Sequence, residues 1–320
     1  MRQGDHLIHK SISRAEPEPR PLIFATDVKR PSHRASTYLR LTKPRIMLLV
    51  LVAAATALVL EGSLLYRPMK LLVFFVGIYL TGGAANALNQ YFERQIDARM
   101  DRTCRRPLPL GLISPSHALI FAVAIGLMGV VLLGAVFNLL TAGLALATIL
   151  FYSLVYTLWL KPRTPQNIVI GGAAGAMAPV GAWAAATGST AVMPWVLFII
   201  IFFWTPPHSW SLALRYKDEY GRAGLAMLPV THGPERTLSW ILLTTVATVG
   251  ASMLHLFAGG GWIYGISALA LGSEFIRRAW LARETQDMYR IWGTFTYSIV
   301  YLFGLLGAMM ADKVITVVTG

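Results

Sequence analysis

The chain has 320 residues, of which 55% are hydrophobic and only 13% are charged, and its formal net charge is +13. Soluble domains carry about 25% charged residues, so this composition excludes an ordinary soluble protein. The positive charge would suit a nucleic-acid-binding protein, but its placement along the chain indicates a membrane orientation signal instead.

Apolar segments of about 20 residues recur along the whole chain, and each is long enough to cross a hydrocarbon core of roughly 30 Å as a helix. They predict an all-α integral membrane protein with about nine transmembrane helices. The expected spans are residues 46–64, 70–92, 115–137, 139–159, 166–187, 192–212, 238–258, 260–277 and 292–311. The eighth span is the weakest, because three glycines leave almost no turn before it.

The basic residues divide unevenly between the two sides of this topology. With the N-terminus inside, 25 of the 28 lysines and arginines fall in the N-terminal tail and the inner loops. Only Arg67, Lys70 and Lys313 remain outside. Cytoplasmic enrichment of lysine and arginine is the usual orientation signal, so the sequence predicts N-in/C-out and an odd number of spans.

Residues 1–45 are predicted to form a basic, flexible cytoplasmic tail. This segment lacks the apolar core of a secretory signal, and its four acidic residues argue against a transit peptide. We therefore expect the inner (plasma) membrane of a bacterium. The single cysteine, Cys104, excludes an internal disulfide and is read as a reduced bystander thiol.

Two inner loops, after the second and sixth predicted spans, are long and rich in acids and bases. Asp97 in the first and Asp218 in the second are 121 residues apart, which corresponds to about four spans. This spacing suggests two four-helix units, 46–159 and 166–277, followed by a final helix at 292–311. Repeats of this kind often place a site at their junction.

The first loop is preceded by a regular series of polar side chains. Asn89, Glu93, Asp97 and Asp101 follow at steps of four residues, so on a helix they form one stripe. Like charges at this spacing repel by roughly a few tenths of a kcal/mol per pair. A divalent cation would neutralise them, and Mg²⁺ is normally held by carboxylates, waters and substrate phosphates. The alternative is a solvated helix end whose acids pair with nearby arginines.

The second loop follows the segment Trp204-Thr-Pro206-Pro207-His208. Two prolines inside a span remove helix hydrogen bonds, a break that is tolerated where the backbone lines a cavity or is buried in protein. His208 directly follows the break and is a candidate functional residue, with a packing histidine as the alternative.

Basic side chains near both loops would face the same compartment as the acids. They suit the outer oxygens of a diphosphate whose other oxygens a metal bridges to carboxylates. The candidates are Arg102, Arg105, Arg106, Lys161, Arg215 and Lys217. The sequence has no Walker loop, no Gly-rich dinucleotide turn and no Cys/His zinc spacing, which sets aside nucleotide hydrolysis and structural zinc. A transporter with a midplane cation site would place ionisable residues deep inside spans, whereas these acids lie at span ends.

The motif Asn89-x-x-x-Glu93-x-x-x-Asp97, followed by Met100-x-Arg102-Thr103, resembles the first acidic motif of the UbiA superfamily of intramembrane prenyltransferases. Three further stretches resemble its heme-farnesylating branch. They are the run from Tyr156-Thr-Leu-Trp-Leu-Lys161 to Gly172, Trp204-Thr-Pro-Pro-His208, and Gly224-Leu-Ala-Met-Leu-Pro229-Val. The likeness extends from Leu41-Thr-Lys-Pro44-Arg45 to about residue 235.

Two positions depart from the family pattern. Glu93 stands where the family more often has aspartate, which keeps the charge and lengthens the reach. The second motif in other branches supplies two aspartates four apart, and only Asp218 is matched here. Whether Glu219 serves as a second ligand stays open.

The resemblance implies a nine-helix bundle around a central cavity open to lipid and capped by the two inner loops. It implies that farnesyl diphosphate and heme b are the substrates and that heme O and diphosphate are the products. A downstream heme A synthase or a terminal oxidase assembly would then be a partner, and nucleic acid would not. The rival within the family is an enzyme that prenylates an aromatic quinone precursor, and the choice between C15 and C20 chains stays open.

The resemblance also assigns roles to residues. The catalytic and metal-binding set is expected to be Asn89, Glu93, Asp97 and Asp218, holding Mg²⁺ or another divalent cation. The basic candidates named above would bind the diphosphate. His208 would help to hold heme b, either as an iron ligand or through a propionate, because histidine is a common ligand of heme iron.

Overall fold

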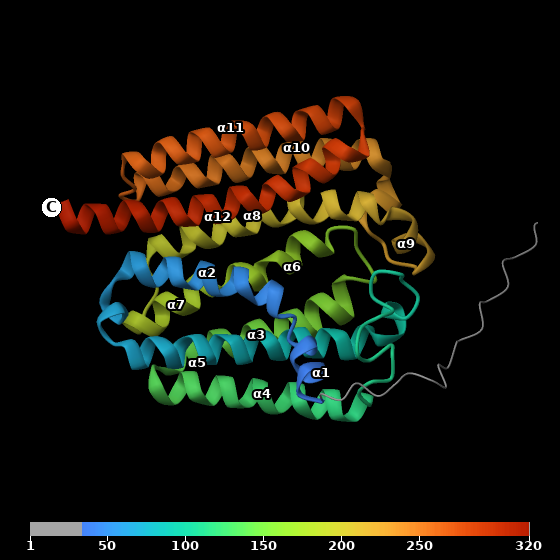
Figure 1. Ribbon diagram of the computed structural model, residues 1–320, viewed down its shortest axis with the longest axis horizontal. Coiled ribbons are helices and arrows are strands. Elements are labelled where there is room, and N and C mark those ends of the chain that lie inside the picture. The colour runs from blue at the N-terminus through green and yellow to red at the C-terminus, as the bar shows by residue number, and fades with distance from the viewer. Residues whose placement is uncertain (1–33, 320) are drawn as a thin grey trace, which may run out of the picture. The chain divides into compact units, whose positions relative to one another are not determined.

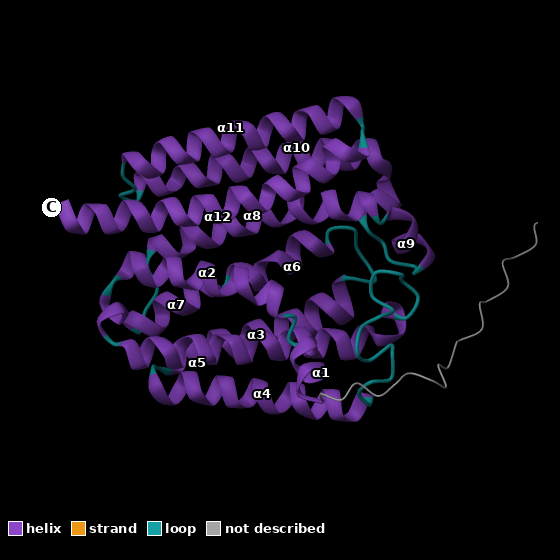
Figure 2. Cartoon of the chain, in the orientation of Figure 1, coloured by secondary structure: helices purple, strands orange, loops and turns teal. Residues whose placement is uncertain are grey.

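The computed structural model describes residues 34–319, and within that range it contains only helices and loops (Figure 2). In chain order the helices are α1 (Arg34–Leu41), α2 (Pro44–Glu61), η1 (Ser63–Tyr66), α3 (Pro68–Asp97), α4 (Pro115–Val136), α5 (Leu139–Leu150), η2 (Phe151–Leu160), α6 (Asn167–Ala176), α7 (Ala178–Thr187), α8 (Val192–Arg215), α9 (Lys217–Arg222), α10 (Leu228–Phe257), α11 (Trp262–Thr285) and α12 (Met288–Thr319).

In the described part of the chain, eight helical segments are long and apolar enough to cross a membrane. They correspond to the first seven and the ninth of the predicted spans. α11 coincides with the eighth and is also a long helix, but Glu274, Arg277 and Arg278 interrupt its apolar sequence. The chain is therefore a multi-pass α-helical membrane protein, while the count of nine and the N-in/C-out orientation stay predictions.

The long helices lie side by side (Figure 1). Short connections gather at one end of the bundle, and two long loops, residues 98–114 and 216–227, lie at the other. Both acidic loops are thus at the same end, as the sequence predicted. α3 spans the whole distance between the two ends, which is about 45 Å for a helix of 30 residues.

Small residues let neighbouring helices approach closely. α3 packs along α4, and a Cβ added at Gly129 of α4 would lie 2.7 Å from the Thr81 side chain of α3. In the second half of the chain, α8 packs along α10 and α11 along α12. Close backbone approach through glycine is the usual way in which membrane helices gain packing contacts. These contacts fix the position of α3, which carries the first acidic motif.

Part of the predicted flexible tail is ordered. Residues 34–41 form α1, whose Leu41 is fully buried beside Ala87, while Tyr38 packs on the ring of Phe121 at 5.0 Å. Tyr38 and Leu41 are three residues apart, so a helical conformation places both on one face. This amphipathic turn explains the difference from the prediction. Residues 1–33 of the tail lie outside the described residues, and the four-helix repeat stays a prediction.

Candidate active site

The stripe at the end of α3 is buried. Asn89, Glu93 and Asp97 are 2%, 5% and 3% exposed, whereas Asp101, beyond the helix end, is exposed. The first three side chains therefore do not belong to a solvated helix end. Burying charged groups is costly unless each has a partner, so their surroundings must supply compensating charge.

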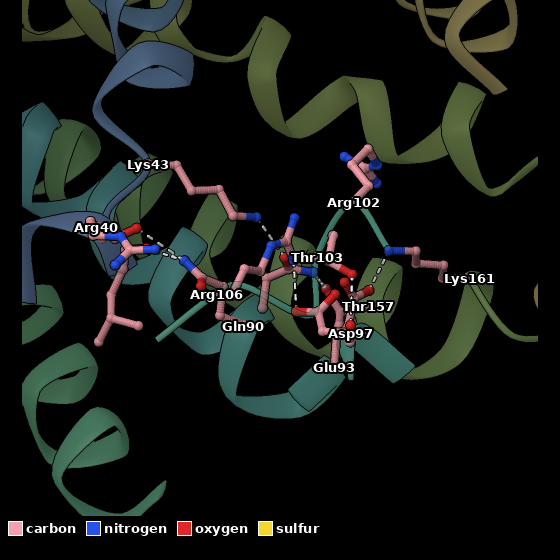
Figure 3. A network of polar contacts seen from close by, with 12 residues as sticks. Arg40, Lys43, Gln90, Glu93, Asp97, Arg102, Thr103, Arg106, Thr157 and Lys161 are labelled. Atoms are coloured by element: carbon pink, nitrogen blue, oxygen red, sulfur yellow. Dashed lines mark hydrogen bonds and ion pairs between the residues drawn. The ribbon is translucent and has the colours of Figure 1, made fainter. Parts of the chain in front are cut away.

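Each buried acid forms an ion pair with a base from another part of the chain (Figure 3). Lys161 Nζ lies 2.5 Å from Glu93 Oε1, and Arg106 Nη1 lies 2.7 Å from Asp97 Oδ2. Burial lowers the pKa of Lys161, but the adjacent Glu93 carboxylate outweighs that effect and leaves the pKa above its ordinary value. Lys161 thus stays charged beside Glu93.

Asn89 completes the row through two hydrogen bonds. Its Oδ1 accepts from Lys43 Nζ at 2.8 Å, and its Nδ2 donates to Thr157 Oγ1 at 3.2 Å. Thr157 in turn donates to the carbonyl of Tyr152 at 2.8 Å. The amide is therefore held in one orientation, with its oxygen bonded to a third base, Lys43.

Lys43 occupies a strained backbone position. Its φ of 51° lies in the left-handed region, which is uncommon for residues other than glycine, and Pro44 follows it directly. Such strain is found preferentially where a side chain must be aimed at a site. Burial, reinforced by the positive charge of Arg106, lowers the pKa of Lys43 to about 7. A bound anion would stabilise the charged form.

Thr157 and Lys161 are positioned by an unusual helix. Residues 151–160 form a π-helix, η2, which continues directly from α5. π-helical segments are rare and are frequently found at functional sites. Gly171 of α6 accommodates this geometry, since a Cβ there would lie 2.3 Å from the Tyr156 ring.

No sequence pattern assigns a role to Lys43 or Thr157. Lys43 reads as an ordinary basic residue before a span, although the Thr-Lys-Pro segment around it belongs to the family likeness. Thr157 carries no signal, because a threonine inside an apolar helix most often bonds its own backbone. Only the folding of three chain segments onto α3 brings these residues together.

Asp218 does not join the buried acids. It is exposed on α9, and in the described residues no three His, Cys, Asp or Glu side chains are grouped closely enough to hold a metal ion. Whether Asp218 joins Asn89, Glu93 and Asp97 as a metal ligand therefore stays a prediction. Three carboxylates drawn together without a cation would repel one another, and here each buried acid is neutralised by its own base.

The donor set on α3 nevertheless fits Mg²⁺. One amide oxygen and two carboxylates are hard oxygen ligands at successive turns of one helix face. Mg²⁺ is usually bound by one or two carboxylates, with waters and substrate phosphates completing its coordination. In this structure Lys43, Lys161 and Arg106 bond to these same oxygens. If a metal ion bound the oxygens instead, the three basic groups would be free to bind a diphosphate.

The two long loops are joined to each other at this end of the bundle. The backbone N–H of Arg102 donates to Glu219 Oε2 at 3.3 Å, and its Nη2 donates to Tyr220 Oη at 3.3 Å. Met100, 2% exposed, packs into an apolar cluster that includes Tyr220 and Leu225. Glu219 is therefore engaged in a contact between loops rather than directed at the acidic row.

The remaining basic candidates lie apart from the acidic row. Arg215 is exposed and stacks on the Trp292 ring at 4.3 Å, so α12 rather than α3 is its partner. Arg105 is exposed, and its carbonyl accepts a hydrogen bond from Arg40 at 2.8 Å. Lys217 begins α9 beside Asp218. Among the predicted bases, Lys161 and Arg106 are the two that the structure pairs with the buried acids.

His208 is part of an aromatic stack between α8 and α12. Its ring lies 4.4 Å from Trp204 and 4.6 Å from Phe295, and its Nδ1 is 2.8 Å from Ser298 Oγ. Trp204 Nε1 donates to the carbonyl of Ser298 at 2.7 Å. The two prolines stay within a continuous α8. The ring is thus well packed and oriented, and it does not line the apolar cavity described next.

An apolar cavity of ≈150 Å³ begins beside the acidic row. Asn86, one turn before Asn89, and Tyr152 of η2 line it at this end. From there it follows α3 to Phe74 and Leu133, which are 1% and 2% exposed. A buried anion-binding end that continues into an apolar cavity suits an amphiphile with a charged head and a hydrocarbon chain.

Similarity to known proteins agrees with this chemistry. Residues 48–311 match the model of the UbiA prenyltransferase family. Among curated relatives, the protoheme IX farnesyltransferase of Azoarcus sp. (strain BH72) is 46% identical over 284 residues, which cover 87% of this chain and 94% of the relative. That of Rhodopseudomonas palustris is 45% identical over 289 residues, which cover 87% and 90%.

The fold has solved counterparts at low sequence identity. A digeranylgeranylglyceryl phosphate synthase aligns with a TM-score of 0.73 and 18% identity, covering 87% of this chain and 98% of that chain. A UbiA homolog from Archaeoglobus fulgidus bound to GPP and Mg²⁺ aligns with a TM-score of 0.57 and 17% identity, covering 85% and 99%. The chain belongs to the UbiA prenyltransferase family, and the curated relatives that it resembles over most of its length are protoheme IX farnesyltransferases.

Proposed function

We propose that this enzyme transfers the farnesyl group of farnesyl diphosphate to a vinyl group of heme b, with addition of water, to give heme O and diphosphate. The observation that carries the proposal is the buried row of Asn89, Glu93 and Asp97, each bonded to a base and followed by an apolar cavity. The names of the similar curated relatives support heme as the acceptor over an aromatic quinone precursor.

The diphosphate would bind at the end of α3. Asn89, Glu93 and Asp97 would hold Mg²⁺ or another divalent cation. The proposed fourth ligand is exposed Asp218 of α9, a helix at the same end of the bundle (Figure 1). Structures of a UbiA relative with Mg²⁺ and prenyl diphosphates support this choice of cation. When bound, the metal supplies positive charge to the departing diphosphate.

The bases of the site would hold the outer oxygens of the diphosphate. Lys43, Lys161 and Arg106 supply three positive groups that converge on one small region. Such groups stabilise the charge that develops on the diphosphate as the carbon–oxygen bond breaks. Arg102, fixed between the two loops, would close the site from the aqueous side.

The farnesyl chain would lie in the apolar cavity. From Asn86 to Phe74 the cavity follows twelve residues of α3, or about 18 Å along the helix. This length suits an extended C15 chain. The walls would also exclude water from the allylic carbon, which protects the cation formed there from premature hydrolysis.

The reaction then needs no side-chain nucleophile. The bond between the allylic carbon and oxygen breaks, and its electron pair leaves with the diphosphate. The vinyl group of heme b supplies the electron pair for the new carbon–carbon bond, and water adds to the resulting cation and loses a proton. Positioning of the two substrates and stabilisation of charge are the contributions of the protein.

The bacterial origin of the similar relatives supports a bacterial inner membrane as the location. A heme A synthase or a terminal oxidase assembly that receives heme O would be the downstream partner.

The test is the product formed by the full-length protein in bacterial membranes. Incubation with farnesyl diphosphate, heme b and Mg²⁺ should give a heme whose mass has increased by one farnesyl group and one hydroxyl group. A parallel incubation with 4-hydroxybenzoate should give no prenylated product, and EDTA should stop the reaction. Prenylation of the aromatic acid without any change in the heme would overturn the proposal.

A further inference from the structure

A second cavity lies at the end of the bundle opposite the acidic row. It has a volume of ≈450 Å³, compared with ≈150 Å³ for the apolar cavity. The connection between α2 and α3, the corner between α4 and α5, and the end of α7 form its wall. Its charged lining residues are Arg67 and Lys70, and its apolar wall includes Leu64, Val136 and Phe137.

The two basic side chains have no acidic partner among the described residues. The nearest acid along the chain, Glu61, lies beside the cavity, because its Oε2 accepts hydrogen bonds from the backbone and hydroxyl of the lining residue Ser63 at 3.0 and 2.7 Å. The side-chain amide of Asn138 joins the carbonyl of Ala184 to the start of α5. Arg67 and Lys70 are both exposed, and two cations against one carboxylate leave the cavity with a net positive charge.

This charge stands out against the rest of the sequence. In the topology predicted from the sequence, only Arg67, Lys70 and Lys313 lie on the side opposite the acidic loops. Two of these three residues line one cavity. The first amide groups of α3 also have no side-chain cap, and their partial positive charge adds to that of Lys70.

The surroundings of the cavity are those of a lipid headgroup region. Tyr66, next to Arg67, is 85% exposed, and Leu139, next to Asn138, is 86% exposed. Exposed tyrosine and leucine at the ends of membrane helices face headgroups and acyl chains. A small inorganic anion would need only the two cations, whereas a phospholipid would also use the apolar wall.

We propose that this cavity binds the phosphate headgroup of an anionic phospholipid. Arg67 and Lys70 pair with the phosphate, and the first methylene groups of the acyl chains lie against Val136 and Phe137. Basic pockets between membrane helices are suited to such headgroups. The lipid links the α2–α3, α4–α5 and α7 ends at a point far from the acidic row.

The experiment uses the full-length protein and does not depend on the proposed reaction. Wild type, the double variant Arg67→Gln/Lys70→Gln and the control Lys313→Gln are equilibrated with vesicles of phosphatidylglycerol or phosphatidylcholine. The lipid that stays bound after extraction is measured by native mass spectrometry. Wild type and Lys313→Gln should retain phosphatidylglycerol over phosphatidylcholine, and the double variant should lose roughly tenfold or more of this preference.

Two results would overturn the proposal. Either the double variant retains phosphatidylglycerol as wild type does, or Lys313→Gln loses as much as the double variant, so that general surface charge explains the binding. Inorganic phosphate is the probe for the other source of the anion. If millimolar phosphate displaces the lipid completely and binds alone, the site is one for a free anion. Thermal unfolding and the single variants Arg67→Gln and Lys70→Gln check that loss of lipid does not reflect misfolding.

Discussion

The two charged regions of this protein are similar in the sequence and different in the structure. At the end of α3, Glu93 and Asp97 are buried; Glu93 is paired with Lys161 from a distant segment, and Asp97 with Arg106 from the loop that follows α3. At the junction of α8 and α9, Asp218 is exposed and Arg215 stacks on a tryptophan of α12. The first region is a buried, ion-paired row that we propose as the site for an anion and a metal, while the contacts seen in the second join loops and helices.

The two regions differ in whether their carboxylates are buried or exposed. A buried carboxylate must be compensated by a nearby base, and that base is then available to a phosphate when a metal arrives. An exposed carboxylate is solvated by water and needs no such base. It can therefore bind a metal ion without first losing an ion pair. Four experiments test whether the two regions differ in this way.

The largest effect is expected from Asp97→Asn and Asp218→Asn. Each substitution keeps the shape of the side chain and removes an anionic oxygen from the proposed metal site, so turnover should fall roughly 10³-fold. Asp97→Asn should also lower the melting temperature, because Arg106 loses its buried partner, whereas Asp218→Asn should not. Product formation and thermal unfolding measure the two effects. If Asp218→Asn kept near wild-type turnover in saturating Mg²⁺, Asp218 would not be a metal ligand and the site would lie in the first region alone.

The next largest effect concerns stability. Lys161→Met should cost about 3 kcal/mol of unfolding free energy, because it leaves Glu93 buried without its base. Glu93→Gln in the same chain should restore much of this loss, since it removes the uncompensated charge. Arg215→Met is the matched control in the second region, where the exposed cation–π contact is worth about 0.5–1 kcal/mol. If Lys161→Met and Arg215→Met lost the same unfolding free energy, the two regions would not differ in how much their charged contacts stabilise the fold.

A third experiment addresses the cavity that continues from the first region. Phe74 closes its far end, so Phe74→Ala should lengthen it and raise the use of geranylgeranyl diphosphate over farnesyl diphosphate by about tenfold, or ~1.4 kcal/mol. Phe75→Ala is the control, because Phe75 packs on Phe74 without lining the cavity. Competition between the two diphosphates, read by product mass, gives the ratio. An unchanged ratio would place the limit on chain length elsewhere.

An effect of the same size is expected for His208, on α8 before the second region. If His208 helps to hold heme b, His208→Ala should weaken heme binding by about tenfold, or ~1.4 kcal/mol, and leave farnesyl diphosphate binding unchanged. Soret absorption and diphosphate binding measure the two separately. Ser298→Ala removes the hydrogen bond and keeps the ring stack, so it separates orientation from packing. Unchanged heme spectra for His208→Ala would make this histidine a packing residue.

The family, the helical fold and the alignment of Asn89, Glu93 and Asp97 on one helix face could be predicted from the sequence. Apolar segments of membrane-spanning length leave little choice but helices, since every backbone polar group must be satisfied inside the bilayer. The spacing of Asn89, Glu93 and Asp97 is likewise local, because steps of four residues on a helix define one face. Both properties depend on residues close together in the chain.

The partners of that row were decided by tertiary structure alone. Lys43 is 46 residues from Asn89, and Lys161 is 68 residues from Glu93, so no local pattern links them. The left-handed backbone at Lys43 and the π-helix that carries Thr157 depend on packing between helices. The exposure of Asp218 has the same origin. Which charges are buried depends on which segments cover them, and only the packing of the helices determines this.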